Sequence, residues 1–398
     1  MRIFNVASDE EIKSGGTTDI YFVRTKKVLR AKGLEKAKVV AEVTINGLPE
    51  NWPWGVLCGL DELAKLFEGC PVNVYAMPEG TIFRTQDHYG NKIPVAAIDG
   101  PYVEFCELET PLLGFICQAS GIATMAARLR KLAWNKLLVA FGIRRAHPAI
   151  SVMIDRASYI GGFDGVSSLS GAKKIGKEPI GTMPHALMVI FGDQVKAWKA
   201  FDEVIPLDVN RVALVDTYFD EKAESIMASD ALGKNLWGVR LDTPGSRRGN
   251  FAEIIREVRW ELDIRGHKHV KIIVSGGIND KSIAGLVKAG VDGFGIGTAL
   301  SNAPTIDFAM DIVEMNGKPV AKRGKLGGRK QVWRCQRCLA DVVLPAKTPA
   351  PKCPACGGKT SALLVPLIKG GKIASRPASV DKIRAYVLAQ LKKIPAVN

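Results

Sequence analysis

The sequence predicts an α/β protein whose central part is an irregular (β/α) barrel, preceded by an α+β domain and followed by a small cysteine module. Between residues 137 and 298, short apolar runs end in polar or glycine clusters, and a helix-like segment follows each run. These returns, about 20 to 35 residues apart, are typical of βα units around a parallel sheet. Their number favours a barrel over an open sheet, and fewer than eight strands and eight helices would make it irregular.

Residues 1–108 are expected to form the α+β domain, because several strand-like runs follow one another with few helices between them. The domain opens with Ser8-Asp-Glu-Glu, a helix-start signal, and a helix is predicted over 60–67. The expected strands are 38–45, 72–77, 93–98 and 102–107. A helix rich in small residues follows over 109–132 and opens the barrel domain, which extends to residue 305.

The strands of the barrel are identified by their apolar runs and by the polar groups at their ends. They are predicted at 137–141, 159–165, 179–183, 211–215, 237–241, 270–274 and 293–296. Residues 251–264 have the pattern of an amphipathic helix. The segment 306–398 then breaks the βα rhythm: 317–330 is a basic, glycine-rich loop or linker, and 379–391 is a final helix.

The positive charge of the chain is local. The 398 residues carry a net charge of +15, yet residues 316–373 contain 13 Lys and Arg and one acid, which leaves only +3 for the rest. Such a segment can bind nucleic acid, or it can be a solvated face near an anionic substrate. No apolar run approaches the roughly 18 residues that span a bilayer, and the start lacks a secretory apolar core. We therefore expect a cytoplasmic protein.

The loop after the predicted strand 237–241 concentrates polar groups between a strand and a helix. Arg240, Asp242 and Thr243 stand at the end of the strand, and Ser246, Arg247 and Arg248 follow a Pro-Gly turn. Loops at the carboxyl ends of parallel strands are where active sites form. A carboxylate can accept from sugar hydroxyls and Arg can bind phosphate oxygens, so a sugar phosphate is one interpretation and a surface ion-pair cluster is the other.

Two consecutive glycine loops predict a phosphate site. They contain Ser275-Gly276-Gly277 and Gly295-Ile-Gly297-Thr298, each between a strand and a helix. In (β/α) barrels the loops after the last two strands often bind phosphate through backbone N–H groups, and glycine allows close approach. Glycine also forms ordinary tight turns, but two such loops in succession favour the phosphate site.

Three further strand ends carry candidate functional side chains. Arg144, Arg145 and His147 supply positive charge, which a pyrophosphate or a carboxylate would require, although a solvated loop has the same composition. His185 and Asp216 follow different strands, and a carboxylate partner would orient the imidazole and stabilise its cation. We expect the two to lie on the same rim of the barrel.

The eight cysteines fall into two groups. Those in the first part of the chain, Cys58, Cys70, Cys106 and Cys117, lie among apolar residues and are expected to be reduced core residues. The other four form Cys335-Gln-Arg-Cys338 and Cys353-Pro-Ala-Cys356, separated by 14 residues. Two CxxC pairs match a structural zinc ribbon, expected over about 331–368, and a redox role is disfavoured because the pair occurs twice.

Six ordered motifs make the chain resemble a known family. They are Phe141-Gly-Ile-Arg-Arg-Ala-His-Pro, Gly161-Gly-Phe-Asp-Gly-Val-Ser-Ser, Gly181-Thr-Met-Pro-His-Ala, Val215-Asp-Thr-Tyr, Arg240-Leu-Asp-Thr and Ser275-Gly-Gly. In this order they resemble the nicotinate phosphoribosyltransferases, in the archaeal form with a carboxyl-terminal zinc ribbon. The similarity runs from Phe4-Asn-Val-Ala-Ser-Asp to the ribbon.

The resemblance implies a type II phosphoribosyltransferase with an amino-terminal open-faced sandwich, an irregular barrel and a carboxyl-terminal segment that partly returns to the first domain. It implies that nicotinate and phosphoribosyl pyrophosphate give nicotinate mononucleotide and pyrophosphate for NAD synthesis. Mg²⁺ assists, and ATP hydrolysis is coupled through a phosphorylated histidine. Active sites shared between subunits imply at least a dimer, or a hexamer built from dimers.

The resemblance also implies roles for individual residues. By motif, His185 is the phosphorylated histidine, Asp216 its acidic partner, and Asp242 the residue that holds the ribose hydroxyls, with Arg240 beside the base. The other implied roles are 5′-phosphate binding by Gly276, Gly277, Gly295 and Gly297, pyrophosphate binding by Arg144, stacking on the pyridine ring by Phe141 and by Tyr21 of a neighbouring subunit, and acceptor choice by Asp164, Ser167 and Ser168. Ser246 and Arg247 lie where the family varies.

Three other functions compete with this assignment. Quinolinate phosphoribosyltransferase shares the fold type but needs no ATP, and Gly181-Thr-Met-Pro-His185 argues against it. A nicotinamide-using relative is kept open by Asp164. An RNA-binding or RNA-modifying barrel protein would use the basic segment and the ribbon, and steep salt dependence of RNA retention would reveal it; no RNA-recognition motif is visible.

Overall fold

The computed structural model describes residues 3–247, 249–374 and 377–395 and divides the chain into two compact units. The first comprises Met1–Thr124 and Pro304–Pro395, and the second comprises Met125–Ala303. The division differs from the expected boundary at residue 108, since it falls within one long helix, α4 (Glu109–Ala133). It also joins the carboxyl-terminal segment Pro304–Pro395 to the first unit.

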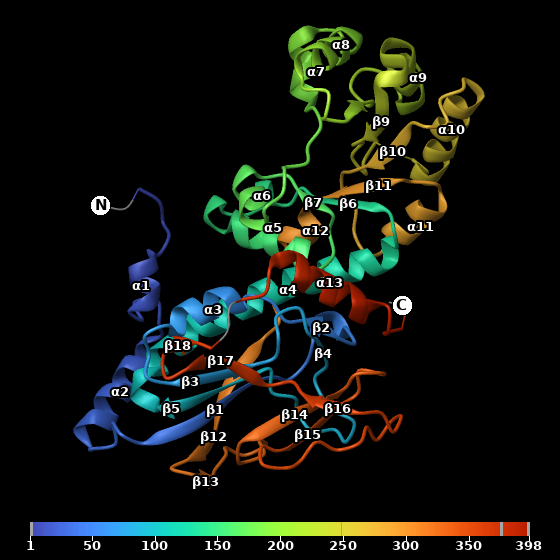
Figure 1. Cartoon of the computed structure of the whole chain (residues 1–398). Coiled ribbons are helices and arrows are strands. Elements are labelled where there is room, and N and C mark those ends of the chain that lie inside the picture. The colour runs from blue at the N-terminus through green and yellow to red at the C-terminus, as the bar shows by residue number, and fades with distance from the viewer. Residues whose placement is uncertain (1–2, 248, 375–376, 396–398) are drawn as a thin grey trace. The chain divides into compact units, whose positions relative to one another are not determined.

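The first unit is built on a seven-stranded antiparallel sheet that draws strands from both ends of the chain (Figure 1). β1 (Lys38–Ile45) lies between β5 and β12, and Ala41 is paired with both Ile98 and Ile312. In spatial order the strands are β13 (Lys318–Pro319), β12 (Phe308–Met315), β1, β5 (Ala96–Pro101), β3 (Asn73–Ala76), β17 (Val365–Lys369) and β18 (Lys372–Ile373).

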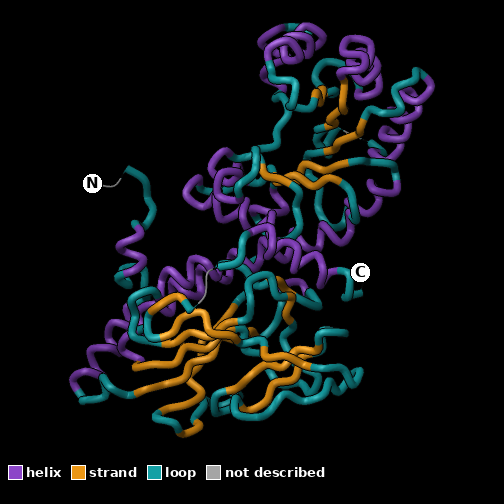
Figure 2. Tube along the Cα trace, viewed as in Figure 1, coloured by secondary structure: helices purple, strands orange, loops and turns teal. Residues whose placement is uncertain are grey.

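Helices cover one face of this sheet, as expected for an open-faced sandwich (Figure 2). The amphipathic helix α3 (Leu60–Phe67) buries Leu63 and Phe67, and the first half of α4 buries Leu112, against strand residues such as Val43. The unit also contains α1 (Asp9–Lys13), α2 (Ile20–Ala31), β2 (Gly55–Val56) and β4 (Ile82–Phe83). α1 begins with the predicted capping box, in which Ser8 and Glu11 bond each other's backbone N–H.

Two strand predictions in the first unit are wrong in part. Residues 102–108 form two 3₁₀ turns, closed by bonds such as Phe105 N–H to Tyr102 C=O, instead of a strand over 102–107. Their apolar spacing fits a three-residue period as well as alternation. The strand expected from Ile93 begins only at Ala96, because Pro94 has no N–H to donate to a ladder.

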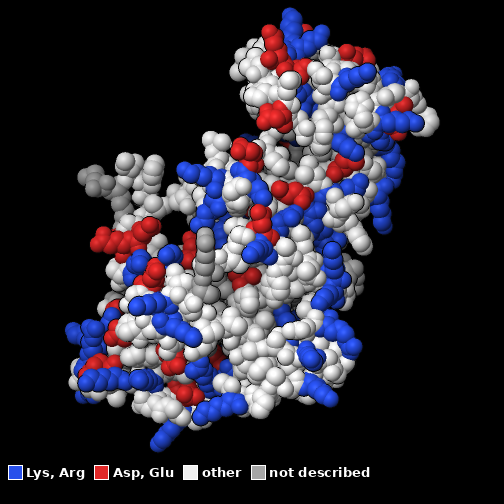
Figure 3. Space-filling view, viewed as in Figure 1, with Lys and Arg blue, Asp and Glu red and all other residues white. Residues whose placement is uncertain are grey.

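The cysteine module is a three-stranded antiparallel sheet in the first unit. It consists of β15 (Asp341–Pro345), β14 (Lys330–Cys335) and β16 (Thr360–Ala362), in that spatial order, and the helix α13 (Val380–Leu391) follows it in sequence. Val332 and Val343 join the core of the first unit. Arg337, Lys347, Lys352 and Lys359 of this module are exposed. Figure 3 shows how Lys and Arg are distributed over one face of the molecule.

The second unit contains a curled, six-stranded parallel sheet, which forms a half-barrel. Its spatial order is β7 (Gly165–Val166), β6 (Leu137–Ala140), β11 (Gly293–Ile296), β10 (Lys271–Val274), β9 (Leu236–Leu241) and β8 (Arg211–Leu214). In the described residues β7 and β8 pair with one neighbour each, so the expected irregular barrel has six strands and is open. Its helices are α5 (Ser151–Ile160), α6 (Leu169–Ile175), α7 (His185–Phe191), α8 (Gln194–Val204), α9 (Glu221–Leu232), α10 (Phe251–Ile264), α11 (Ile283–Lys288) and α12 (Thr298–Ser301).

One predicted barrel strand is much shorter than expected, and another is absent from the described sheet. Helix α5 continues to Ile160, so the strand expected over 159–165 shortens to Gly165–Val166. Residues 179–183 are not a strand, although Ile180 N–H donates to the carbonyl of Val166 at 2.8 Å. Pro179 and Pro184 supply no N–H at either end of that segment, which limits pairing.

One helical stretch, Cys106–Ala133, is long and apolar enough to cross a membrane by length and composition. The helix itself was expected over 109–132, but it was not expected to be long and apolar enough to span a bilayer. Of its most apolar window, 72% is buried inside the protein, as in the core helix of a soluble protein.

Candidate active site

A cavity of about 660 Å³ opens at the carboxyl ends of the parallel strands in the second unit. The polar and basic side chains that line it are Arg144, Arg145, Ser167, Thr182, Arg240, Asp242, Ser275 and Thr298. Phe141 and the glycines 276, 277, 295 and 297 complete much of its surface. Most of the residues predicted from separate strand ends therefore surround one cavity.

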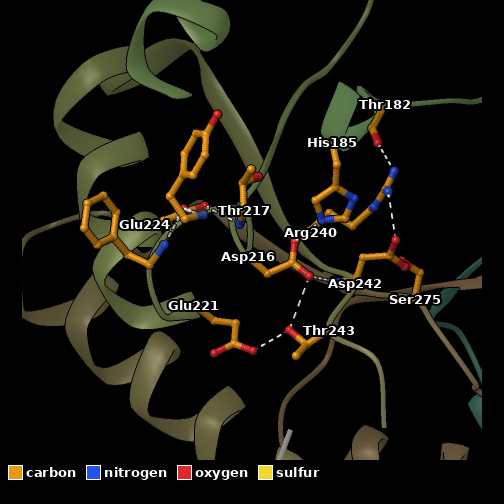
Figure 4. A network of polar contacts seen from close by, with 12 residues as sticks. Thr182, His185, Asp216, Thr217, Glu221, Glu224, Arg240, Asp242, Thr243 and Ser275 are labelled. Carbon is orange, nitrogen blue, oxygen red and sulfur yellow. Dashed lines mark hydrogen bonds and ion pairs between the residues drawn. The ribbon is translucent and has the colours of Figure 1, made fainter. Parts of the chain in front are cut away.

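Asp242 is the carboxylate of this cavity, and it is held in place from two sides. Its Oδ1 accepts a hydrogen bond from Ser275 Oγ at 2.5 Å, and its Oδ2 lies 3.4 Å from Arg240 Nη2 (Figure 4). Arg240 is fixed in turn by a hydrogen bond to Thr182 Oγ1. The side chain of Asp242 is 30% exposed, so it can still reach a ligand.

His185 and Asp216 form the predicted pair. His185 is the first residue of α7, and its Nε2 lies 3.1 Å from Oδ1 of Asp216, which follows β8 (Figure 4). The imidazole is 41% exposed, whereas the Asp216 side chain is only 5% exposed. Burial raises the pKa of Asp216; His185 opposes that rise and the neighbouring Asp242 adds to it.

Helix α9 supplies two buried carboxylates that the sequence reading did not identify. Glu224 accepts the backbone N–H groups of Thr217, Tyr218 and Phe219 at 2.7–3.0 Å, which fixes the turn after Asp216. Glu221 accepts the hydroxyl of Thr243, and that hydroxyl also lies 3.3 Å from Asp216 Oδ2. Acids in the first turn of a helix usually complement its dipole, so their spacing alone gave no sign of a site.

The glycine loops bring backbone close to the cavity. Gly276 and Gly277 have φ of 82° and 68°, a conformation that favours glycine, and a Cβ on Gly276 would lie 3.0 Å from the Asp242 carbonyl. A Cβ on Gly295 would lie 2.3 Å from the Phe141 ring. Glycine at 295 therefore allows the aromatic ring to rest on the backbone of β11.

His185, Asp216 and Thr243 lie outside the cavity lining, and several other predicted residues do too. His147 accepts the N–H of Ala149 through Nδ1 and caps a short turn. Asp164 accepts hydrogen bonds from Arg130 Nη2 at 2.5 Å and from the N–H of Leu138, in β6, at 2.9 Å. Ser168 caps α6 and donates to the buried Asp155.

The remaining predicted residues lie on other loops or in the first unit. Tyr21 belongs to α2 of that unit, where it is 56% exposed and its ring is tilted against that of Phe22, with the centroids 4.3 Å apart. Ser246 and Arg247 are exposed in the loop after β9, and Arg248 lies outside the described residues.

The four cysteines of the CxxC pairs converge, as predicted. Their sulfur atoms all lie within 4.8 Å of one another, with Cys335 and Cys356 at 3.4 Å and Cys338 and Cys353 at 3.6 Å. A tetrahedral ion with Zn–S bonds of about 2.3 Å holds its sulfurs about 3.8 Å apart. Donor type and spacing therefore fit a metal ion such as zinc.

Comparison with known proteins gives consistent relatives. Residues 19–120 and 122–311 match the N-terminal and C-terminal domains of the quinolinate phosphoribosyl transferase family. Nicotinate phosphoribosyltransferase pncB2 of Mycobacterium tuberculosis is 32% identical over 336 residues, which cover 81% of this chain and 69% of the relative. The chain belongs to the nicotinate phosphoribosyltransferase family.

Solved structures agree with this membership. Nicotinate-nucleotide pyrophosphorylase from Pyrococcus furiosus is 55% identical and covers 99% of each chain, with a TM-score of 0.94. Human nicotinic acid phosphoribosyltransferase is 22% identical, covers 95% of this chain and 94% of its own, and has a TM-score of 0.75, so it shares the fold. The members of this family are phosphoribosyltransferases, and the half-barrel with its strand-end cavity is the corresponding fold.

Proposed function

We propose that the protein joins nicotinate to phosphoribosyl pyrophosphate, forming nicotinate mononucleotide and pyrophosphate for NAD synthesis, and that ATP hydrolysis is coupled through His185. The observation that carries this proposal is the pair formed by His185 and Asp216, whose Nε2 and Oδ1 atoms lie 3.1 Å apart. Asp216 also accepts the backbone N–H of Asp242, the carboxylate of the cavity. The family names of the relatives supply the substrate class.

The cavity supports the transfer step. Departure of pyrophosphate leaves positive charge on the ribose, which a fixed carboxylate stabilises. Asp242 is suited to this, since Ser275 holds one of its oxygens and Arg240 lies beside the other. The guanidinium groups of Arg144 and Arg145 would neutralise the leaving pyrophosphate, and the loops at Gly276 and Gly295 would receive the 5′-phosphate.

The acceptor would stack on Phe141. Its ring rests on Gly295 and lines the cavity, so a planar pyridine can lie against an immobile face. Tyr21 of a partner subunit would cover the opposite face, which makes a dimer the smallest complete unit. Ser167 lines the same cavity and would contact the acceptor carboxylate. Thr243, Thr298 and Arg240 would complete the binding of the substrates.

His185 has the arrangement of a nucleophile. A carboxylate at Nε2 selects the tautomer with the proton on that nitrogen and leaves a lone pair on Nδ1. Nδ1 would form a bond to the γ-phosphorus of ATP while the bond to the ADP oxygen breaks. The phosphorylated side chain carries roughly two additional negative charges, and its hydrolysis would commit the enzyme to the product.

Two metal ions have different roles in this proposal. Among the described residues that line the cavity, Asp242 is the one acidic side chain. A single carboxylate suits Mg²⁺, because this ion is usually held by one or two carboxylates and by substrate phosphates. Bound there, Mg²⁺ would neutralise phosphate charge. Zn²⁺ would be held by Cys335, Cys338, Cys353 and Cys356, and a site with four thiolates is closed and structural.

Product formation from phosphoribosyl pyrophosphate and Mg²⁺ tests the proposal. Nicotinate, nicotinamide and quinolinate are compared with and without ATP, in the wild type, in His185→Ala and in the matched control His147→Ala, whose histidine caps a short turn. We expect mononucleotide from nicotinate, with ATP stimulation that His185→Ala loses and His147→Ala keeps. Stimulation that survives in His185→Ala contradicts the coupling.

Quinolinate phosphoribosyltransferase is the second candidate, because its family models match residues 19–120 and 122–311. That reaction accepts a dicarboxylic acid, releases CO₂ and needs no phosphorylated histidine. Release of CO₂ from quinolinate by the wild type, with no product from nicotinate, would replace the proposed function with this one.

A further inference from the structure

Arg240 is held between two segments that meet at the cavity (Figure 4). Its Nη1 donates a hydrogen bond to Thr182 Oγ1, and its Nη2 lies 3.4 Å from Asp242 Oδ2. Its Nε has no partner among the residues that the structure describes, and the side chain is 13% exposed. The position of the guanidinium therefore depends on Thr182 as much as on Asp242.

Thr182 belongs to residues 178–184, which connect α6 to α7 and form neither helix nor strand. This segment, the arm, is docked on the half-barrel at a second point. The N–H of Ile180 donates to the carbonyl of Val166 at 2.8 Å. The Ile180 side chain lies over Gly165, where an added Cβ would come within 2.3 Å of its Cδ1. The hydrogen bond with Arg240 thus adds a polar side-chain attachment to this one.

The arm leads directly into His185, the first residue of α7. Met183 is 2% exposed, so the arm is anchored in the core between Thr182 and the histidine. Pro179 and Pro184 have a fixed φ, which makes the arm stiff although it is irregular. Since Thr182 stands three residues before His185, a shift of Thr182 is passed on to the imidazole.

A second set of contacts links His185 to the same strand end. Asp216 accepts the backbone N–H of Asp242 through Oδ2 at 3.1 Å, and its Oδ1 lies 3.1 Å from His185 Nε2. Arg240 belongs to the end of β9, and Asp242 directly follows that strand. One strand end therefore positions the histidine from two sides, through Thr182 and the arm and through Asp216.

From these contacts we infer that Thr182 is a positioning residue: it ties the arm to Arg240, so that a ligand on Arg240 holds His185 in its reactive position. A guanidinium has five N–H donors, and each Nη atom of Arg240 keeps a second one for an anionic group in the cavity. A carboxylate or phosphate there fixes the guanidinium, and the fixed guanidinium keeps its bond to Thr182. The inference rests on the proposed function and adds to it a link between the cavity and the ATP-dependent step.

The link acts in both directions. If a ligand in the cavity favours the docked arm, the docked arm must favour the ligand by the same factor. His185 would therefore meet ATP in its docked position mainly when the cavity is occupied, which limits ATP hydrolysis at an empty site. Loss of one hydrogen bond to a charged group predicts an effect of about tenfold.

Amide hydrogen exchange in the full-length protein tests the inference, with nicotinate mononucleotide, the proposed product, as the probe. In the wild type we expect the probe to slow exchange in the glycine loops at 275–277 and 295–298 and, by about tenfold, in the arm. In Thr182→Val, saturating probe should still protect the loops, but the arm should exchange as in the free protein. The probe should also bind this variant about tenfold more weakly, and Thr182→Ser, which keeps the hydroxyl, should restore both effects.

Two other variants separate this link from general support of the fold. Ile180→Ala removes the apolar attachment of the arm and leaves the bond to Arg240. It should therefore speed exchange in the free protein, while the probe still slows exchange about tenfold. Thr305→Val replaces an exposed threonine of the first unit and should match the wild type.

ATP hydrolysis gives a functional readout of the same link. Nicotinate and phosphoribosyl pyrophosphate together should stimulate it in the wild type and in Thr182→Ser. The stimulation should be about tenfold smaller in Thr182→Val, because the arm no longer responds to the occupied cavity.

The outcomes distinguish this inference from the proposed function. If the probe protects the glycine loops of the wild type but not the arm, or protects the arm equally in Thr182→Val, the link is excluded and the proposed function stands. If the probe protects neither region, nicotinate mononucleotide does not bind the cavity, and the proposed function fails together with the inference.

Discussion

Charged side chains serve different purposes around the sheet of the first unit and at the cavity of the second. In the first unit, charges are paired with each other: Arg334 and Asp341, both 4% exposed, form two parallel bonds of 2.8 and 2.7 Å, and Lys330 lies 2.8 Å from the buried Glu42. In the second unit, Asp242 and His185 are oriented by neighbours yet remain accessible at 30% and 41%. Paired charges hold a fold, whereas oriented and accessible charges can act on a ligand.

This difference predicts that changes in the first unit alter stability and that changes in the cavity alter activity. Removal of zinc should have the largest effect on stability, because four-thiolate sites in zinc peptides are worth about 10 kcal/mol or more. Chelation, or Cys353→Ser, should release the metal and lower the melting temperature in parallel with the measured zinc content. Cys70→Ser, outside the cluster, is the control, and equal melting of the metal-free and metal-loaded protein would contradict a structural role.

Replacement of the cavity carboxylate should show the opposite behaviour. Asp242→Asn keeps the shape of the side chain and removes its charge, so we expect kcat to fall about a hundred- to thousandfold with little change in the melting temperature. Glu257→Gln, on the helix that follows the same loop, removes an acid that is 60% exposed and pairs with Lys222. Its kcat should be that of the wild type, and a similar loss in both variants would remove Asp242 from the proposed mechanism.

Replacement of one member of the buried Arg334–Asp341 pair should alter stability and leave activity unchanged. Asp341→Asn leaves the guanidinium of Arg334 buried without its counter-charge, which costs about 3–5 kcal/mol of unfolding free energy. Denaturant unfolding measures this loss, and kcat should be unchanged where the protein remains folded. The surface pair Lys65–Glu68, at 67% and 44% exposure, offers the control Glu68→Gln, for which about 1 kcal/mol or less is expected.

The sequence predicted best those elements whose pattern is local and regular. Helices 60–67 and 251–264 and strand 38–45 have the predicted bounds, because each has a clear apolar periodicity. The strand prediction for residues 102–107 was wrong, because a short apolar segment fits both the spacing of a strand and that of a 3₁₀ helix. The antiparallel pairing of β17 with β3 joins residues almost 300 positions apart, and nothing in either segment encodes that register.

The candidate site followed the same rule. Strand-end position was enough to bring His185 and Asp216 together and to surround one cavity with Arg144, Asp242 and the glycine loops. The role of Asp164 in acceptor choice came from the family resemblance and stays a prediction; in the structure Asp164 accepts hydrogen bonds from Arg130 and from the backbone of Leu138. The contact of Glu221 with Thr243 was not predicted, because it joins a helix to a loop that lies more than 20 residues further along the chain.

The smallest effect is expected at Asp155. This carboxyl group of the second unit is fully buried, and it contacts Ser168 and does not line the cavity. Burial raises its pKa to about 6, while bonds from Ser168 oppose the rise. The folded protein therefore binds a proton, between about pH 4 and 6, that the unfolded chain releases. The contribution of Asp155 to the free energy of unfolding is fully present below about pH 4, falls as pH rises through about 6, and stays low at neutral pH.

Asp155→Asn imitates the protonated form, so it should stabilise the protein at neutral pH by at most about 3 kcal/mol, with the gain disappearing towards pH 4. Unfolding by denaturant at several pH values measures this dependence. Asp202→Asn should behave in the opposite way, since bonds from Asn235 and Arg211 lower the pKa of Asp202; it should destabilise the protein at neutral pH and have no effect in acid. A neutral-pH loss in Asp155→Asn would mean that the ionised form of Asp155 stabilises the fold of the second unit.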